Sequence, residues 1–278
     1  MVVKRSISSR IGEVLAIIAS IVFFLLVFYF VVINSFKSNA EAGKMTLLFP
    51  KDWQIIKNYK YIFTYNEGIF VRSLWNSIKL TFFSIGILVI LSSMTAFILA
   101  RRKGKIMRTS NYLILAGLIV PPAIIPTYWV LSIMNISNTL FGLILVEVAT
   151  MFPFSVMLYR NFLLTIQTEI DEAAIIDGCG TIRLFINIIF PLLKPITIAI
   201  IILRSVIVYN DFANPMYFLP GAKNSTVQLC VYLFQGTFTS QWGYLFAAIV
   251  IISLPPLILY ILLNRKILEG MTIGAVKG

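Results

Sequence analysis

The chain has 278 residues, of which 59% are hydrophobic and 12% are charged, and it carries a net charge of +12 with no histidine. Its apolar runs of about twenty residues are long enough to cross a bilayer as helices and indicate an integral membrane protein. The missing histidine and two cysteines outside any CxxC pattern argue against a zinc site, a histidine-dependent catalytic triad or a redox centre.

The positive charge follows the apolar runs and does not form a face for nucleic acid. Lysine and arginine gather near the N-terminus, at residues 101–108, at residues 159–194 and in the tail. These segments share one side of the membrane if every apolar run crosses it, and the positive-inside rule makes that side cytoplasmic. The opposite side holds segment 34–77, which is basic but weighs less because it is long. We therefore expect both termini to be cytoplasmic and no nucleic-acid partner.

Six apolar runs predict six transmembrane helices. They cover residues 14–33, 80–100, 112–134, 139–158, 195–219 and 244–263. The first run is longer than a signal-peptide core and is interpreted as a retained span. The third contains Pro121, Pro122 and Pro126 and should be kinked or broken, because proline removes a helical hydrogen bond. The sequence thus predicts an all-α polytopic membrane protein with a single domain, residues 1–278.

The stretch EIDEAAIIDGCG, residues 169–180, lies in the longest cytoplasmic loop, residues 159–194. Good helix formers from Glu172 onward predict a short helix, and Gly178 suits a left-handed ending. Thr181 can cap a second short helix.

The apolar face of this helical pair should dock into a groove of another protein, because so short a loop offers it no tertiary partner. That face consists of Ala173, Ala174, Ile176, Leu184 and Phe185. The alternative is an amphipathic helix resting on the bilayer. Its exposed side is acidic, however, and anionic lipid would repel it.

These residues resemble a known family. EAAIIDG followed by Ile189, Phe190 and Pro191 resembles the EAA loop of ABC importer permeases. Over nearly its full length the chain is similar to the second permease subunit of maltose-type sugar importers. The further matching segments are Asn76-Ser77, Pro121-Pro122, Asn138-Thr139, Pro153-Phe154, Asn210-Asp211-Phe212, Gly270-Met271-Thr272 and the terminal GAVKG. Tyr209 stands where relatives often carry tryptophan.

The resemblance implies the type I ABC importer permease fold in a bacterial cytoplasmic membrane. It also implies a homologous second permease, two copies of a cytoplasmic ATPase that grip the EAA loops, and an external binding protein that delivers sugar. The sequence contains no GxxxxGK[ST] phosphate-binding motif. We therefore expect a transport subunit that is not an enzyme and has no cofactor of its own, with ATP and Mg bound by the ATPase partners.

The resemblance assigns ATPase coupling to one stretch of the loop. Its residues are Glu172, Ala173, Ala174, Ile176, Asp177 and Gly178. Glu172 is expected to pair with a basic residue of the ATPase, and the two alanines permit close approach. At the C-terminus, Gly274, Val276 and Lys277 are expected to reach the same interface. The plain alternative for everything after Arg265 is a disordered end.

Ionisable residues in the apolar runs are the candidates for a translocation path. Glu147, Arg204 and Asp211 are costly in a membrane and should face a bundle interior or water, and Asn210 accompanies them. Arg204 and Asp211 are seven residues apart and so should share one helical face. A Glu147–Arg204 ion pair that only fixes helix register is the structural alternative.

Other functions remain open at this stage. The cargo of an ABC importer could instead be glycerol phosphate or a polyamine. An ion-coupled secondary carrier would suit proline-broken helices and buried carboxylates, but such folds often show internal repeats that this chain lacks. A membrane enzyme ranks last, because no nucleophile and base occur together. Segment 34–77, with aromatics among lysines, is either an element along the outer interface or a contact for the binding protein.

Overall fold

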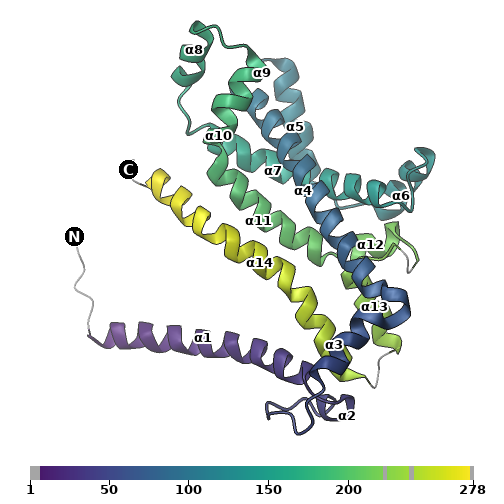
Figure 1. Cartoon of the computed structure of the whole chain (residues 1–278). Helices are drawn as coiled ribbons and strands as arrows, with labels where there is room; N and C mark the ends of the chain where they lie inside the picture. Colours follow the sequence, from purple (N-terminus) through teal and green to yellow (C-terminus); the bar gives the residue numbers. More distant parts are fainter. Residues whose placement is uncertain (1–6, 222–223, 238–240, 276–278) are drawn as a thin grey trace. The chain divides into compact units, whose positions relative to one another are not determined.

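The computed structural model describes residues 7–221, 224–237 and 241–275, and every regular element in these ranges is helical (Figure 1). The predicted all-α fold class is confirmed. The helices are α1 Ile7–Ser35, α2 Asn39–Ala42, α3 Ile55–Thr64, α4 Ile69–Arg101, α5 Lys105–Ile119, α6 Ile124–Ile133, α7 Leu140–Leu163, α8 Glu169–Ile176, α9 Thr181–Leu184, α10 Phe190–Leu192, α11 Lys194–Asn210, α12 Ala213–Phe218, α13 Val227–Thr237 and α14 Trp242–Ala275. A short 3₁₀ helix, Tyr65–Gly68, precedes α4, and a π-helical turn, Phe185–Ile189, precedes α10.

The helices form two compact units. The N-terminal unit contains the chain up to Phe70 together with Val231–Leu254. The central unit contains Val71–Cys230 and the chain from Pro255 onward. The boundary inside α14 falls at the Pro255–Pro256 pair. That residues 1–278 form a single domain stays a prediction.

Several helices are apolar and long enough to cross a bilayer. Three of them in the described ranges qualify by length and composition, in segments Ile55–Arg101, Leu140–Leu163 and Trp242–Leu263. Thr181–Leu192 and Lys194–Asn210, which meet at a bend of 73°, qualify as a fourth span when the pair is counted as one. Ser20–Ser35 and Ile124–Ile133 are apolar but shorter. The count of six spans therefore stays a prediction.

The expected break in the third apolar run is confirmed. Helix α5 ends at Ile119 and α6 begins at Ile124, so the intervening chain contains both Pro121 and Pro122. Val120 adopts an extended conformation (φ −71°, ψ 120°), as a residue before proline prefers.

The fifth apolar run ends earlier as a helix than its composition predicts. Helix α11 stops at Asn210, and Asp211 is extended with ψ 127°. Its carboxylate Oδ1 accepts hydrogen bonds from the backbone N–H of Ala213 (2.9 Å) and Asn214 (3.3 Å), which starts α12. The prediction of one helix over 195–219 is therefore wrong, because a capping carboxylate divides the apolar run. Arg204 and Asp211 do not share one continuous helical face.

Helix α7 lies at the centre of the central unit and contacts α5, α11 and α12. Tyr159 is completely buried, and its hydroxyl donates to Thr197 Oγ1 of α11 at 3.0 Å. Leu143 and Leu163, also fully buried, extend the same apolar core along α7. This packing fixes α7, and with it the point at which the following loop begins.

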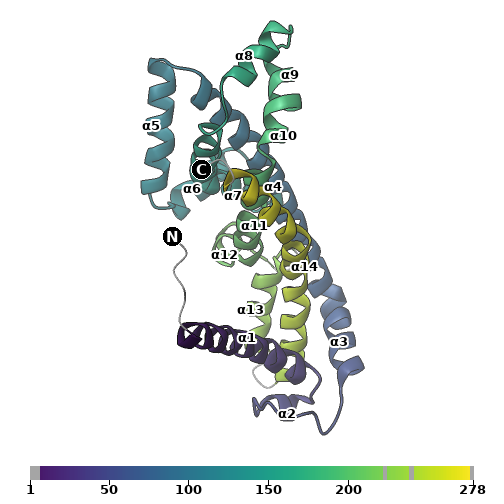
Figure 2. The ribbon, with the colours of Figure 1, turned by 90° about the vertical axis from the view of Figure 1, so that its left-hand side faces the viewer.

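In the N-terminal unit, the end of α1, the start of α3 and the start of α14 are joined by polar contacts. Asn58 Nδ2 donates to the backbone oxygens of Ser35 (2.8 Å) and Lys37 (2.9 Å). The Gly243 N–H donates to Asn39 Oδ1 at 3.0 Å. A Cβ on Gly243 would lie 2.8 Å from the Lys37 carbonyl oxygen, so no side chain fits there without backbone movement. Figure 2 shows α2 and α3 beside the end of α1 and the start of α14.

Candidate functional site: coupling loop and intramembrane polar cluster

The predicted coupling loop contains the expected helix, tight turn and second helix. Helix α8 begins at Glu169, earlier than expected, and ends at Ile176. Gly178 then adopts the left-handed conformation with φ +78°, which confirms the glycine ending. A Cβ at this position would meet nothing within 4 Å among the described residues. Glycine is therefore favoured here by its backbone conformation and not by lack of space.

The predicted apolar docking face of α8 is divided between two environments. Ala174 is buried and packs in the core of the chain itself, whereas Ala173 and Glu172 are exposed. Ile175 and Ile176 are 60% and 84% exposed. The expectation that the whole face lacks an internal partner is thus wrong for Ala174. The side of α8 that remains free carries both an acid and large apolar groups.

The second helix differs from the prediction at its start and in its packing. The N-cap of α9 is Gly180, and Thr181 is its first helical residue, so the expected threonine cap is wrong. Leu184 is buried in the core. The Phe185 ring lies 5.5 Å from that of Phe97 in α4. Leu184 and Phe185 therefore hold the loop to the membrane helices and are not part of a free docking face.

A buried ion pair anchors α8 to the end of α4. Arg101 Nε donates to Asp171 Oδ2 at 2.7 Å, and both side chains are nearly buried, at 12% and 11% exposure. Arg101 Nη2 also donates to Asp171 Oδ1 (3.4 Å) and to the backbone oxygen of Ile166 (3.2 Å). Sequence reasoning missed this pair because Arg101 was interpreted only as a topology charge. The two residues are 70 positions apart, and no local pattern links them.

This geometry gives the loop a held side and a free side. The held side joins α8 to α4 through Arg101, and it joins α9 to α11 through continuous chain that bends by 73°. The free side presents Glu172, Ile175 and Ile176. The free side is therefore linked through the loop to both α4 and α11.

Only part of the predicted ATPase contact at the C-terminus lies within the described residues. Helix α14 continues to Ala275, so Gly274 lies in its last turn, and the alternative of disorder after Arg265 is wrong as far as Ala275. Val276 and Lys277 lie outside the described residues.

The polar residues expected in the membrane are only partly brought together. Glu147 in α7 is 1% exposed, and its Oε1 accepts a hydrogen bond from Asn214 Nδ2 of α12 at 3.1 Å. Asp211 itself lies at the break between α11 and α12. Next to this break, Asn210 Oδ1 accepts a hydrogen bond from Gln228 Nε2 at 3.0 Å. Asn214 and Gln228 are members of the cluster that hydropathy did not indicate.

Arg204 belongs to a different environment. Its guanidinium carbon lies 4.5 Å from the centroid of the Phe154 ring, a cation–π contact. Arg204 and Glu147 both belong to the described part of the chain, and they form no ion pair with each other there. The Glu147–Arg204 pair considered from the sequence is therefore not present.

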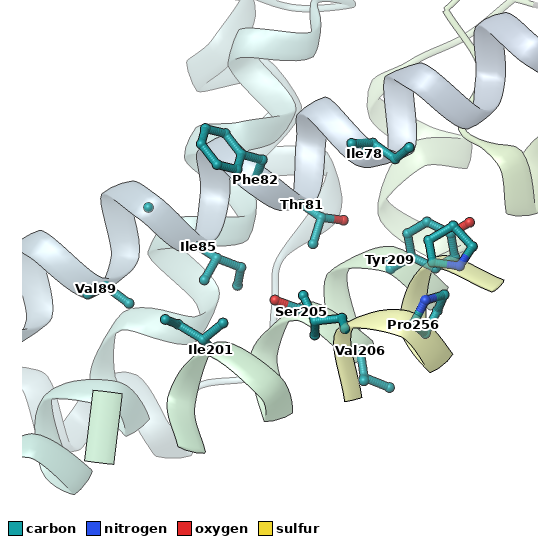
Figure 3. A pocket seen from close by; sticks show the side chains of 13 residues that line it. Ile78, Thr81, Phe82, Ile85, Val89, Ile201, Ser205, Val206, Tyr209 and Pro256 are labelled. Atoms are coloured by element: carbon teal, nitrogen blue, oxygen red, sulfur yellow. The ribbon is translucent and has the colours of Figure 1, made fainter. Parts of the chain in front are cut away.

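An apolar pocket of about 360 Å³ lies in the central unit between α4, α11 and α14 (Figure 3). Its lining residues are Ile78, Thr81, Phe82, Ile85, Gly86, Val89, Ile201, Ser205, Val206, Tyr209, Pro255, Pro256 and Leu259. Thr81 Oγ1 is buried without a hydrogen-bond partner in the described chain. With so few polar groups, the pocket suits apolar groups better than a polyhydroxylated ligand.

Comparison with known proteins gives the family. A family model described as binding-protein-dependent transport system inner membrane component matches residues 92–268. The chain is 32% identical over 277 residues to the melibiose/raffinose/stachyose import permease protein MelC of Bacillus subtilis, covering 99% of each. It is 33% identical over 253 residues to the probable starch degradation products transport system permease protein AmyC of Thermoanaerobacterium thermosulfurigenes, covering 90% of each.

A solved structure shares the fold. It is the crystal structure of a bacterial ABC transporter involved in the import of the acidic polysaccharide alginate, and one chain of it matches with a TM-score of 0.80. The identity is 22%, and the match covers 94% of this chain and 98% of that one. The chain therefore belongs to the family of binding-protein-dependent transport system inner membrane components, the membrane permeases of ABC importers.

Proposed function

We propose that this permease moves a sugar or oligosaccharide, delivered by an external binding protein, into the cytoplasm at the expense of ATP. The relatives named for melibiose, raffinose, stachyose and starch products support a carbohydrate cargo. The observation that carries the mechanism is the coupling loop, whose Ile175 and Ile176 are exposed while its Asp171 is tied to the end of α4. Such a loop suits transmission of force from a partner to the helices.

The proposed complex contains this chain, a homologous second permease, two copies of a cytoplasmic ATP-binding subunit and the extracytoplasmic sugar-binding protein, all in membrane lipid. The ATPase subunits bind ATP and Mg and carry out hydrolysis. Glu172 pairs with a basic residue of the ATPase, Ala173 lets the two chains approach closely, and Ile176 fills an apolar hollow. Asp177 and Gly178 close the helix beside it. Ala174 acts from within, because it fixes α8 on the core.

In this arrangement the coupling loop and both termini are cytoplasmic. The basic residues near the loop and tail support that orientation. Gly274, in the last turn of α14, and Val276 and Lys277 beyond it, are proposed to reach the ATPase interface.

The cargo path is proposed to pass the polar cluster at the break between α11 and α12. Glu147, Asn210 and Asp211 offer carboxylate and amide groups that can exchange hydrogen bonds with sugar hydroxyls. Arg204 is proposed to line the same path from its position over Phe154. If Arg204→Met keeps the transport rate and substrate range while lowering only thermal stability, its place on the path is wrong.

The central test is uptake by the complete complex in proteoliposomes with ATP enclosed. We expect raffinose or a related oligosaccharide to enter only with ATP hydrolysis and the binding protein. Ile176→Glu and Glu172→Lys should lower uptake about tenfold or more while insertion and thermal stability stay unchanged, because both side chains are exposed. Leu164→Glu, on an exposed residue before α8, is the matched control and should retain uptake.

Two results would replace this proposal. Uptake driven by an ion gradient without ATP would favour a secondary carrier. Uptake of glycerol phosphate or spermidine in place of sugar would keep the ATP-driven mechanism and change the cargo.

A further inference from the structure

The loop between α2 and α3, residues 43–54, folds back along α1. The Tyr29 hydroxyl donates a hydrogen bond to the backbone oxygen of Leu47 at 3.0 Å, and the rings of Tyr29 and Phe49 lie 6.2 Å apart, edge to face. Tyr29 precedes the last residue of α1, Ser35, by six positions, or roughly 9 Å along the helix axis. Leu47 and Phe49 therefore lie beside the apolar part of α1 and not beyond its end.

A fully buried lysine fixes the position of this loop beside α1. Lys37 is 0% exposed, and its ammonium donates to Asn34 Oδ1 (3.0 Å), to the Thr46 carbonyl oxygen (2.7 Å) and to Thr46 Oγ1 (3.1 Å). These bonds use all three protons of the ammonium group. Asn34 Nδ2 adds a bond to the same carbonyl of Thr46 at 3.2 Å. The position of the loop next to α1 is thus built into the N-terminal unit.

The side chains that this loop presents outward are large and apolar. Leu48 is 71% exposed, Phe49 68%, and Trp53 54%, with Ile56 of the first turn of α3 at 83%. Trp53 stacks on Phe36 with ring centroids 6.0 Å apart, so it is held in an exposed position. Water alone does not favour four such groups in one short segment.

Lysines surround these apolar side chains. Lys44, Lys51 and Lys57 are exposed on the loop and at the start of α3, while Asp52 is the only exposed acid in residues 43–57 of the described chain. The Glu41 carboxylate accepts the backbone N–H of Lys51 at 3.1 Å. Aromatic and apolar groups with a lysine rim are typical of segments that lie in the interfacial region of a bilayer.

We propose that residues 44–56 form an interfacial membrane anchor, with Leu48, Phe49 and Ile56 in lipid beside α1 and Lys44 and Lys51 at the phosphates of lipid headgroups. The return of the loop toward the apolar part of α1 favours lipid over a protein partner, since a docking surface for a water-soluble protein would lie beyond the helix end. The proposal requires only that α1 crosses a bilayer, and it is independent of the cargo and of ATP coupling.

The test measures the depth of one loop residue in lipid. In the full complex in nanodiscs, with Cys179→Ser and Cys230→Ala, Phe49→Cys is labelled with an environment-sensitive fluorophore. Spin-labelled lipids should quench it within about twofold of Phe23→Cys, a 73% exposed position in the apolar run of α1. Aqueous iodide should quench it weakly. Leu48→Cys repeats the measurement without removing the ring that contacts Tyr29.

Two further outcomes decide the proposal. Lys37→Met should reduce lipid quenching at Leu48→Cys, because the bonds to Thr46 are lost. Strong iodide quenching with weak lipid quenching at both positions would overturn the anchor. Shielding of these positions only after the binding protein is added would overturn it in favour of a protein-docking surface. Failure of sugar uptake with lipid quenching intact would contradict the proposed cargo and leave the anchor standing.

Discussion

The coupling loop and the α2–α3 loop are each held by a cation with little or no exposure, but the partners of the two cations differ. Arg101 reaches Asp171, 70 positions away, and so joins α8 to another helix. Lys37 finds its acceptors in Asn34 and Thr46, within nine positions. A distant partner lets a segment pass displacement to the membrane helices, whereas near partners only give a segment a fixed shape. The comparison predicts different consequences when each cation is removed.

Loss of Arg101 should have the largest effect. Arg101→Met leaves Asp171 nearly buried without its counter-charge, so we expect a loss of about 3 kcal/mol in the free energy of unfolding. It should also separate ATP hydrolysis from uptake, because α8 loses its tie to α4. Thermal unfolding of the purified complex and the ratio of ATP hydrolysed to sugar imported measure the two effects.

The double variant Arg101→Met with Asp171→Leu separates stability from transmission. Replacement of both charges by apolar groups should recover much of the stability, since no unpaired charge remains. The coupling of ATP hydrolysis to sugar uptake should stay impaired. Full recovery of coupling in the double variant would contradict a transmitting role for the pair.

Loss of Lys37 should cost less. Lys37→Met removes the donors to Asn34 Oδ1 and Thr46, at about 1–3 kcal/mol for the unsatisfied acceptors. Burial lowers the pKa of Lys37 and nearby Glu41 opposes that shift, so part of this loss is offset when the buried charge disappears. The temperature of thermal unfolding should fall, while the coupling of ATP hydrolysis to sugar uptake should be retained. Lys60→Met, on an exposed lysine of α3 outside the proposed anchor, is the control and should stay within about 0.5 kcal/mol.

Gly178 tests the turn of the coupling loop. Gly178→Ala should destabilise the turn by about 1 kcal/mol, because φ is +78° and alanine is strained there. Gly180→Ala is the matched control, since φ is −71° and the added methyl group meets nothing within 4 Å among the described residues. Faster amide hydrogen exchange in residues 174–180 of Gly178→Ala alone would support this. Equal exchange in both variants would contradict it.

The two cysteines give the mildest test, because labelling leaves the sequence intact. Burial raises the pKa of the Cys230 thiol to about 11, although a hydrogen bond with Ser73 opposes the shift. Cys179, in the coupling loop, is half-buried. Maleimide should modify Cys179 at least about tenfold faster, because thiolate is the reactive form and access is better. Added ATPase subunits should slow only Cys179. If mass spectrometry shows similar labelling rates for both thiols, the burial of Cys230 in α13 is wrong.

Local patterns predicted much of this fold. Apolar runs located the main helices, and Pro121 and Pro122 located the break between α5 and α6. The acids and Gly178 located α8 and its end. The end of α11 was not predictable in this way, because apolar residues continue to Leu219 and hide the capping role of Asp211.

The site was predictable only where it depended on neighbours in sequence. The sequence interpretation placed Ala174 and Ile176 on one apolar face, but residues two apart point to different sides of a helix, and packing shows that Ala174 meets the core and Ile176 does not. The Arg101–Asp171 pair and the Glu147–Asn214 bond join distant positions. Charge and hydropathy indicate that such groups need partners, and the fold decides which ones.

The 73° angle between Thr181–Leu192 and α11 has a mechanical consequence. A push delivered along the first limb falls mostly across the axis of the second, as in a crank. Helix α11 would then swing about its Lys194 end and would slide little along its length. Asn210, at the far tip of that lever, would sweep the widest arc.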